Sequence, residues 1–163
     1  DWVLIEMRNA NDPADVEIRA GLLLTDGTIV DADMTAGVSF HSLNANTDYY
    51  MIVRHRNHAD IMSAAPINTN SGMMSHDFTT DMAQAMGSNQ MNTTTDGKYV
   101  MVAGDIDGNG IITVADFNYY LAESSSINQY LDSDITLEGS VTVGDFNAYQ
   151  VNSSHIGITD IRY

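Results

Sequence analysis

Over roughly its first hundred residues the chain alternates short apolar, β-branched runs with polar turns, a pattern that predicts strands rather than helices. The first run, residues 1–8, ends at the turn signal Asn-Ala-Asn-Asp-Pro, and the second, residues 16–25, ends at Asp26-Gly27, a strong signal for a two-residue hairpin. Further strands are expected at residues 37–41, 48–56, 60–64, 76–79 and 98–103. About seven short strands predict a mainly β fold, an antiparallel β-sandwich.

The stretches around these strands refine the fold class. Residues 66–74 and 81–97 are polar, Met-rich loops, with a short helical turn expected inside the second. Val38-Ser-Phe-His-Ser-Leu43, followed by Tyr49-Tyr-Met-Ile-Val53, resembles a strand pair of the prealbumin-like sandwiches of bacterial surface proteins. That resemblance extends over about residues 20–55 and implies a sandwich of the same class.

Beyond the strands, an internal repeat occupies residues 102–151. One copy reads Asp-Ile-Asp-Gly-Asn-Gly-Ile-Ile-Thr-Val-Ala-Asp from Asp105 to Asp116. The other reads Asp-Ile-Thr-Leu-Glu-Gly-Ser-Val-Thr-Val-Gly-Asp from Asp134 to Asp145, an offset of 29 residues (134 − 105), and both copies continue into Phe-Asn. Two related loops of twelve residues are therefore expected in one compact region.

The spacing of oxygen-bearing residues in both loops suits calcium. A twelve-residue loop binds Ca²⁺ through its first, third, fifth, seventh (carbonyl), ninth (often through water) and twelfth positions, with oxygens at about 2.3–2.6 Å. In the first loop these positions hold Asp105, Asp107, Asn109, Ile111, Thr113 and Asp116. In the second loop the predicted ligands are Asp134, Thr136, Glu138, the carbonyl of Ser140, and Asp145. Gly110 and Gly139 fall at the sixth position, where the chain must bend sharply.

Neither loop follows a helical pattern, so each is a loop-then-helix half motif rather than a full EF-hand. Here the sequence resembles the dockerin family of secreted bacterial proteins, over about residues 103–155 and most specifically in Gly104-Asp-Ile-Asp-Gly-Asn-Gly110. The resemblance implies ligand roles for the aspartates and Asn109 of the first loop, and for Asp134, Thr136, Glu138 and Asp145 of the second. The second loop departs from the family pattern with a neutral hydroxyl at its third position and a long Glu at its fifth, which predicts weaker binding.

Helices are expected after each loop, at residues 114–123 and 143–152. The large apolar residues at helical spacing, which we expect to pack the two repeats face to face, are Phe117, Tyr120, Leu121, Phe146 and Tyr149. The apolar residues at the eighth loop positions, Ile112 and Val141, are expected to tie the two loops together. The predicted organisation is a β-sandwich domain over 1–102, a dockerin-like domain over 103–155 and a strand-like tail over 156–163.

The amino-acid composition limits the possible binding partners and the expected location of the protein. A net charge of −16 argues against nucleic acid and anionic membranes as partners, since both would repel the chain. Cysteine is absent, so calcium is the available staple for a protein outside the cell. No apolar run approaches the roughly 20 residues of a membrane span, and no basic, apolar leader precedes Asp1. A secreted, extracellular or cell-surface location is expected.

Catalytic motifs are not found in the sequence. There is no Gly-x-Ser-x-Gly elbow, no phosphate-binding Gly-rich loop and no His-Glu-x-x-His helix. His55 and His58 lack a nearby third ligand and are interpreted as part of a solvated loop. Asn92 and Asn152 lie in Asn-x-Ser/Thr triplets and are candidate sites for an N-linked glycan.

These features predict a non-enzymatic, calcium-binding structural module, a subunit of a surface assembly or filament. Both ends, residues 2–7 and 156–161, are apolar and β-prone, so head-to-tail self-association through terminal strands is the expected polymer contact. One alternative is a docking module for a cohesin-like receptor, although Val114-Ala115 and Val143-Gly144 stand where dockerins carry polar recognition residues. Another is a carbohydrate-binding module that uses Trp2 or the tyrosines.

Overall fold

The computed structural model describes residues 1–161, and its architecture is mainly β, with antiparallel sheets and two α-helices. The strands are β1 (Trp2–Asn9), β2 (Val16–Leu23), β3 (Ile29–Val30), β4 (Asp48–His55), β5 (His58–Met62), β6 (Ile67–Asn68), β7 (Met91–Thr93) and β8 (Tyr99–Met101). The helices are η1 (Thr69–Ser71), η2 (Met82–Gln84), α1 (Val114–Glu123) and α2 (Val143–Asn152). The chain divides into two compact units: residues 1–54 with 61–100 form the first, and residues 55–60 with 101 onward form the second.

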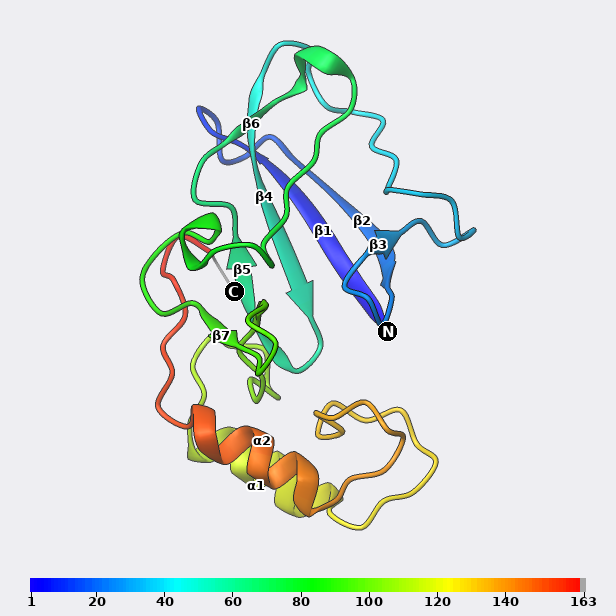
Figure 1. The fold of residues 1–163 in the computed structure, drawn as a ribbon, viewed down its shortest axis with the longest axis vertical. Helices are drawn as coiled ribbons and strands as arrows, with labels where there is room; N and C mark the ends of the chain where they lie inside the picture. Colours follow the sequence, from blue (N-terminus) through cyan, green and yellow to red (C-terminus); the bar gives the residue numbers. More distant parts are fainter. Residues whose placement is uncertain (162–163) are drawn as a thin grey trace. The chain divides into compact units, whose positions relative to one another are not determined.

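The first unit is built on a six-stranded sheet with the order β3-β2-β1-β4-β5, in which β6 also pairs with β4 (Figure 1). β1 and β2 pair antiparallel from Trp2 opposite Leu22 to Arg8 opposite Val16. Alternate β1 side chains are buried, as at Val3 and Met7, while Trp2 on the other face is 50% exposed. The period-two pattern of the sequence thus places one face of β1 in the core.

Between β2 and β3 the chain reverses at the expected Asp-Gly turn. The Leu24 N–H donates to the Thr28 carbonyl at 2.8 Å, and Gly27 adopts φ +87°. Three residues rather than two therefore form the loop, with glycine at the left-handed position that such loops require. The predicted hairpin is confirmed, with one additional loop residue.

Two predicted strands, 37–41 and 76–79, are wrong. Residues 37–41 form only a parallel bridge between Gly37 and Val30, because nearby carboxylates take their backbone donors. The Glu17 carboxylate accepts the N–H of His41 at 3.0 Å, and Asp31 accepts that of Ser39 at 3.2 Å. Side-chain acceptors of this kind compete with a sheet ladder. The strand pair of the prealbumin-like resemblance accordingly forms only in its second member, β4.

The remaining strand predictions differ from the structure in their bounds. The strands expected at 48–56, 60–64 and 98–103 appear as β4, β5 and β8, while the short β6 and β7 lie in stretches that were expected to be loops. The predicted helical turn forms as η2. Within residues 156–161 no strand forms, since Ile156 makes only an isolated bridge to Ile111; the last two residues of the expected tail lie outside the described part of the chain.

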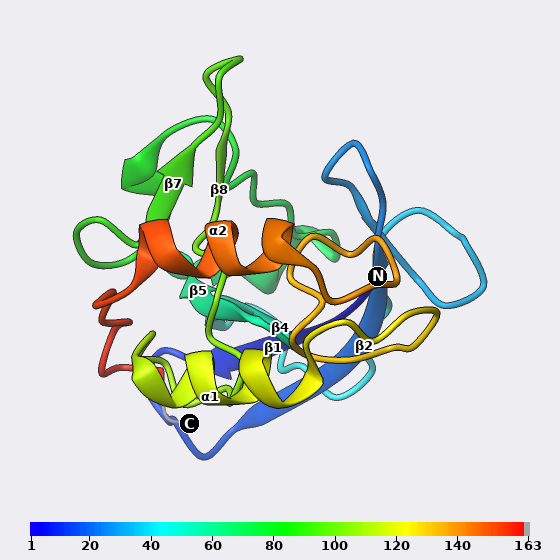
Figure 2. The ribbon, with the colours of Figure 1, turned by 90° about the horizontal axis from the view of Figure 1, so that it is seen from below.

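In the second unit, α1 and α2 begin and end where the sequence predicts. Both start with a capping box, in which Thr113 and Asp116, or Thr142 and Asp145, satisfy each other's backbone N–H groups. The two helices run antiparallel beside each other, as Figure 2 shows from the direction of the colour change along each.

Tyr49 offers a test of the packing in the first unit. Its side chain is 0% exposed, its hydroxyl donates to the Asp15 carboxylate at 2.9 Å, and it accepts the Asn44 N–H at 3.0 Å. Tyr49→Phe should lower the free energy of unfolding by about 1–2 kcal/mol, because two polar groups lose a buried partner. Tyr50→Phe, at the next and half-buried position, should change it by no more than about 0.5 kcal/mol in the same denaturant titration. Equal losses in both variants would contradict this role for the Tyr49 hydroxyl.

Candidate metal centre

The first loop brings three carboxylates together. Asp105, Asp107 and Asp116 each offer one oxygen, and these oxygens lie within 4.8 Å of one another. Asp105 and Asp116 are 1% and 0% exposed, whereas Asp107 is open to solvent. Within residues 1–161 this is the single group of three or more acidic, His or Cys side chains arranged in this way, and it can hold a metal ion.

Backbone N–H groups of the loop hold the two buried carboxylates in place. Asp105 accepts the N–H groups of Asn109 at 3.1 Å and Gly110 at 2.9 Å. Asp116 accepts the N–H groups of Ile106 and Thr113, both at 2.7 Å. The twelfth loop residue therefore closes the loop and caps α1 at the same time, and its oxygens face the other carboxylates.

The pKa of Asp105 reflects both its burial and the neighbouring negative charges. Burial raises the pKa of the Asp105 carboxyl, and the neighbouring carboxylates of Asp116 and Asp107 raise it further, against the lowering effect of the Gly110 N–H. A cation among these oxygens would remove both penalties. Because all donors are oxygens, the set suits a hard divalent ion rather than a thiophilic metal.

The second loop reproduces the backbone frame of the first. Asp134 accepts the N–H groups of Glu138 at 3.1 Å and Gly139 at 2.8 Å. Asp145 accepts the N–H group of Thr142 at 2.7 Å and is 0% exposed. The two loops therefore fold alike, and they differ in the side chains added to that frame.

In the second loop, threonine hydroxyl groups form hydrogen bonds with the carboxylates. The Thr136 hydroxyl donates to Asp145 at 3.0 Å, and the Thr142 hydroxyl contacts Glu138 at 3.1 Å. Burial by itself would raise the pKa of Asp145, but the N–H groups of Thr136 and Thr142 and their hydroxyls outweigh burial and lower the pKa. The Asp145 carboxylate is thus stabilised as an anion by donors of its own loop.

The remaining predicted ligands have other local roles. The Asn109 side-chain oxygen accepts the Ile111 N–H at 2.8 Å, which fixes the turn at the fifth to seventh positions. Ile111 is 43% exposed, and Ser140 forms a bridge with Ile127. Their carbonyls, predicted as the seventh-position ligands, remain a prediction.

The two repeats are cross-paired through their backbones. The Ile112 N–H donates to the His155 carbonyl at 3.0 Å, and the Val141 N–H donates to the Ser126 carbonyl at 2.9 Å. Both eighth-position residues are buried as predicted, and Ile112 shares a buried cluster with Ile135 of the second loop. The backbone of each also pairs with the segment after the other repeat's helix. His155 and Ser126 are related by the same 29-residue offset (155 − 126), so the duplication is preserved in the structure.

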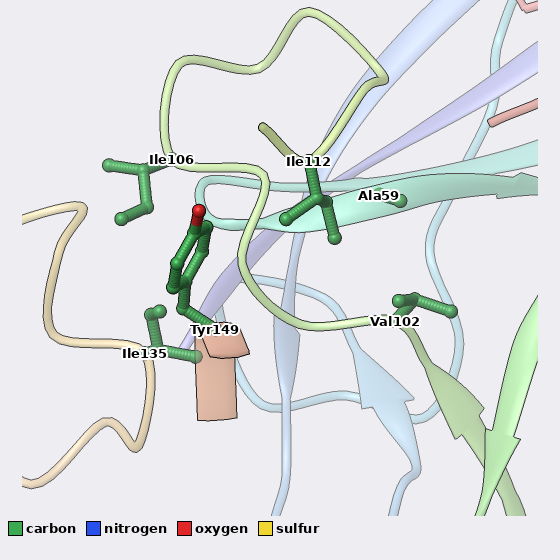
Figure 3. Close-up of a cluster of buried hydrophobic side chains, with 6 residues drawn as sticks. All are labelled: Ala59, Val102, Ile106, Ile112, Ile135 and Tyr149. Atoms are coloured by element: carbon green, nitrogen blue, oxygen red, sulfur yellow. The ribbon is translucent and has the colours of Figure 1, made fainter. Parts of the chain in front are cut away.

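A buried apolar cluster, drawn in Figure 3, includes residues of both loops. Its members are Ala59, Val102, Ile106, Ile112, Ile135 and Tyr149. The Tyr149 hydroxyl also donates to the Thr113 carbonyl at 2.9 Å, so α2 supports the first loop. Gly104 fits there only as glycine, because its φ is +118° and a Cβ would lie 3.3 Å from the Tyr149 Cα.

Aromatic rings join the two helices. Phe117 lies 5.9 Å from Phe146 and 6.1 Å from Tyr149, and Tyr120 lies 5.8 Å from Phe146, measured between ring centroids. The predicted face-to-face packing is confirmed for these four residues. It is wrong for Leu121, which is 58% exposed.

The turn between β4 and β5 belongs to this unit, which the sequence did not indicate. Asn57 at its tip is 0% exposed and donates to the carbonyls of Asp132 and Asp134, each at 2.8 Å. The interpretation of His55 and His58 as a solvated loop is wrong: His55 is 7% exposed, and their Nδ1 atoms lie 3.0 Å apart. No signal in the residues around the turn indicates that it is covered.

Comparison with known protein families, curated proteins and solved structures finds no match to this chain. Function must therefore be inferred from the geometry of the site. No helix among residues 1–161 is long and apolar enough to cross a membrane. The side-chain nitrogen of Asn152, a candidate glycan site, donates to the carbonyls of Ala103 at 2.8 Å and Ala148 at 3.1 Å, and a sugar on it would remove at least one of these bonds.

The fourth loop position gives a matched test of backbone strain. Leu137 has φ +62° in the second loop, where the first loop has Gly108 at φ +66°. A left-handed conformation costs a residue with a side chain about 1–2 kcal/mol. Leu137→Gly should raise the free energy of unfolding by about 0.5–1 kcal/mol, and Gly108→Ala should lower it by about 1 kcal/mol, measured by denaturant titration in chelator. A loss of stability in both variants would show that packing of Leu137 outweighs strain.

The buried histidines predict a dependence of stability on pH. Burial, with a smaller contribution from the Arg56 charge, lowers the pKa of His55 to about 4. In the unfolded chain the His55 imidazole takes up a proton near pH 6.5, whereas in the folded chain it does not. The contribution of neutral His55 to the free energy of unfolding is therefore complete above pH 6.5 and is lost as the pH falls toward 4. The slope is up to about 1.4 kcal/mol per pH unit. Unfolding measured at pH 7 and pH 5 should show a smaller pH effect in His55→Asn than in the unmodified chain, and an unchanged effect would contradict the assignment.

Proposed function

We propose that the chain is a non-enzymatic, extracellular structural module in which Ca²⁺ bound to the first loop stabilises the second unit. The observation that carries the proposal is the convergence of Asp105, Asp107 and Asp116, two of them buried, in a loop whose backbone already fixes their direction. In this proposal the first unit is a sandwich-type scaffold and the second is a dockerin-like pair of loop–helix repeats.

Calcium is favoured over other ions by the donor set and the loop length. Oxygen ligands spaced through a flexible twelve-residue loop suit the six to eight contacts that Ca²⁺ takes, whereas Mg²⁺ requires a smaller and stricter octahedron. Asp105, Asp107, Asn109 and Asp116 would supply side-chain oxygens, with the Ile111 carbonyl as a further ligand. The bound ion would neutralise the mutual repulsion of the three carboxylates, and this gain would appear as stability.

Head-to-tail assembly with other copies through the terminal strands, the role expected of a surface subunit, is part of this proposal. β1 pairs with β2 over seven residues and lies next to β4 on its other side. Residues 156–161 form no strand within this chain. The terminal segments, residues 2–7 and 156–161, are the proposed contacts, and the face of β1 and β2 that carries Trp2, Leu4 and Ile18 is exposed beside them.

A docking role is the second candidate, although the two helix N-termini carry apolar residues where dockerins carry polar recognition residues. Val114 and Val143 occupy the same position in the two repeats and are 68% and 69% exposed. Exposed apolar residues at equivalent positions of a duplicated unit suit recognition by a protein partner. Such a partner would contact these valines through an apolar surface, unlike a receptor that binds polar residues at these positions.

The calcium proposal predicts that Asp107→Asn weakens metal binding without unfolding the loop. Asp107 is exposed and its carboxylate accepts the Asn109 N–H at 3.2 Å, whereas Asp105 and Asp116 also close the loop. Calorimetric titration of the unmodified chain should show a tight site, and Asp107→Asn should weaken it at least about tenfold. At a calcium concentration 100 times the dissociation constant, binding should add about 2.7 kcal/mol to the free energy of unfolding.

Asp33→Asn is the matched control, because Asp33 is another exposed carboxylate that accepts the N–H of the residue two positions on, at 2.9 Å. This variant should keep the calcium response of the unmodified chain. In chelator, all three proteins should unfold at nearly the same denaturant concentration. If the unmodified chain is equally stable in calcium and in chelator, the first loop is an acidic turn without a metal and the proposal fails.

A further inference from the structure

The turn between β4 and β5 places a guanidinium beside the second loop. Arg56 is 12% exposed, and its Nη2 lies 4.0 Å from the Asp134 carboxylate and 3.4 Å from the Asp134 carbonyl. Its Nη1 donates to the Leu131 carbonyl and lies 3.9 Å from Asp132. The guanidinium carbon lies 4.3 Å from the centre of the Tyr130 ring, which holds the side chain over the loop. A fixed positive charge thus sits next to the first predicted ligand of this loop.

Asn57 fixes the same segment. Its side-chain nitrogen donates to the carbonyls of Asp132 and Asp134, and its own carbonyl accepts the Gly104 N–H at 2.8 Å. Residues 131–134 are therefore held by donors from the turn, on the side where the chain enters the second loop. The segment needs no ion to satisfy its carbonyls.

Inside the loop, threonine hydroxyl groups form hydrogen bonds with the carboxylates. Thr136 donates to Asp145, and Thr142 contacts both Glu138 at 3.1 Å and Asp145 at 3.3 Å. The first loop differs at the third position, where Asp107 adds a third carboxylate in place of the Thr136 hydroxyl. Positive charge and hydroxyl donors are thus supplied to the second loop by the protein, whereas three carboxylates converge in the first.

We propose that Arg56 serves as the resident cation of the second loop, so that this loop is ordered without metal and binds calcium weakly because the guanidinium repels a divalent ion. The inference rests on the proposed calcium binding of the first loop and adds a regulator of the second. Each chain then takes up one ion in the concentration range where the first loop fills. The role of Arg56 is electrostatic, because its guanidinium lies beside the loop and carries a fixed positive charge.

The first test uses the unmodified chain in chelator. Hydrogen exchange should show that the amides of Gly139 and Thr142, which donate to Asp134 and Asp145, exchange at least about tenfold more slowly than those of Gly110 and Thr113 in the first loop. Equal or faster exchange in the second loop would overturn the inference, because that loop would then need an ion as much as the first.

The second test removes the charge. The Gly110 and Gly139 amide signals report the two loops separately during a calcium titration followed by nuclear magnetic resonance. Arg56→Gln should raise the calcium affinity reported by Gly139 about tenfold or more, the effect of removing one unit charge near a divalent ion even at a water-like dielectric constant. Arg56→Lys keeps the charge and should leave that affinity within about threefold of the original. A purely structural role predicts the opposite sign, because loosening the loop would weaken binding.

The two signals also separate the inference from the proposed function. If Gly110 does not respond to calcium in the unmodified chain, the calcium function of the first loop fails. If Gly110 responds while Gly139 is unchanged or weakened in Arg56→Gln, the resident-cation inference fails by itself. Should Arg56→Gln not fold, the exchange rates of the unmodified chain still decide the question.

Discussion

Each loop of the second unit depends on carboxylates that its own backbone requires as hydrogen-bond acceptors. Asp105 and Asp116 close the first loop, and Asp134 and Asp145 close the second. The acceptors cannot be removed without opening the turn, yet bringing them together concentrates negative charge in a partly dehydrated place. A loop of this design is stabilised by positive charge or hydrogen-bond donors near its carboxylates, and in the second loop Arg56 and the Thr136 hydroxyl supply them.

The duplication explains why neither repeat is a folding unit by itself. Ile112 pairs with the segment after α2, and Val141 pairs with the segment after α1. Rings from both helices interlock between them, with Phe117 in contact with Phe146 and Tyr149. Half of the unit would therefore leave buried backbone groups and aromatic surface without partners, which costs more free energy than a single loop regains.

Local features of this chain could be predicted from the sequence, and features that depend on distant residues could not. The helices were predicted because the spacing of their large apolar residues is local, and in the structure Thr113 with Asp116, and Thr142 with Asp145, cap their first turns. Strand β1 was predicted because its alternation is intrinsic. The strand expected at 37–41 failed because Glu17, more than twenty residues earlier, accepts its backbone N–H groups.

The same division holds for the candidate site. The three carboxylates of the first loop follow from spacing within twelve residues, and the structure brings them together. The contact of Arg56 with Asp134 joins positions 78 residues apart and leaves no periodic or compositional trace. Likewise, the burial of His55 and His58 follows from where β4 and β5 turn and is not visible in the residues around them.

Residues 55–60 are separated in sequence from the rest of the unit to which they belong, and this limits how the chain can be reused. Asn57, buried at the tip of the turn, supplies hydrogen bonds that no residue after 100 replaces in the described structure. A gene segment encoding only the repeats would lack it, so the pair of loops is not a cassette that recombination can attach intact to another protein. We therefore expect the pair of loops and the β4–β5 turn to be gained or lost together in any lineage that carries them.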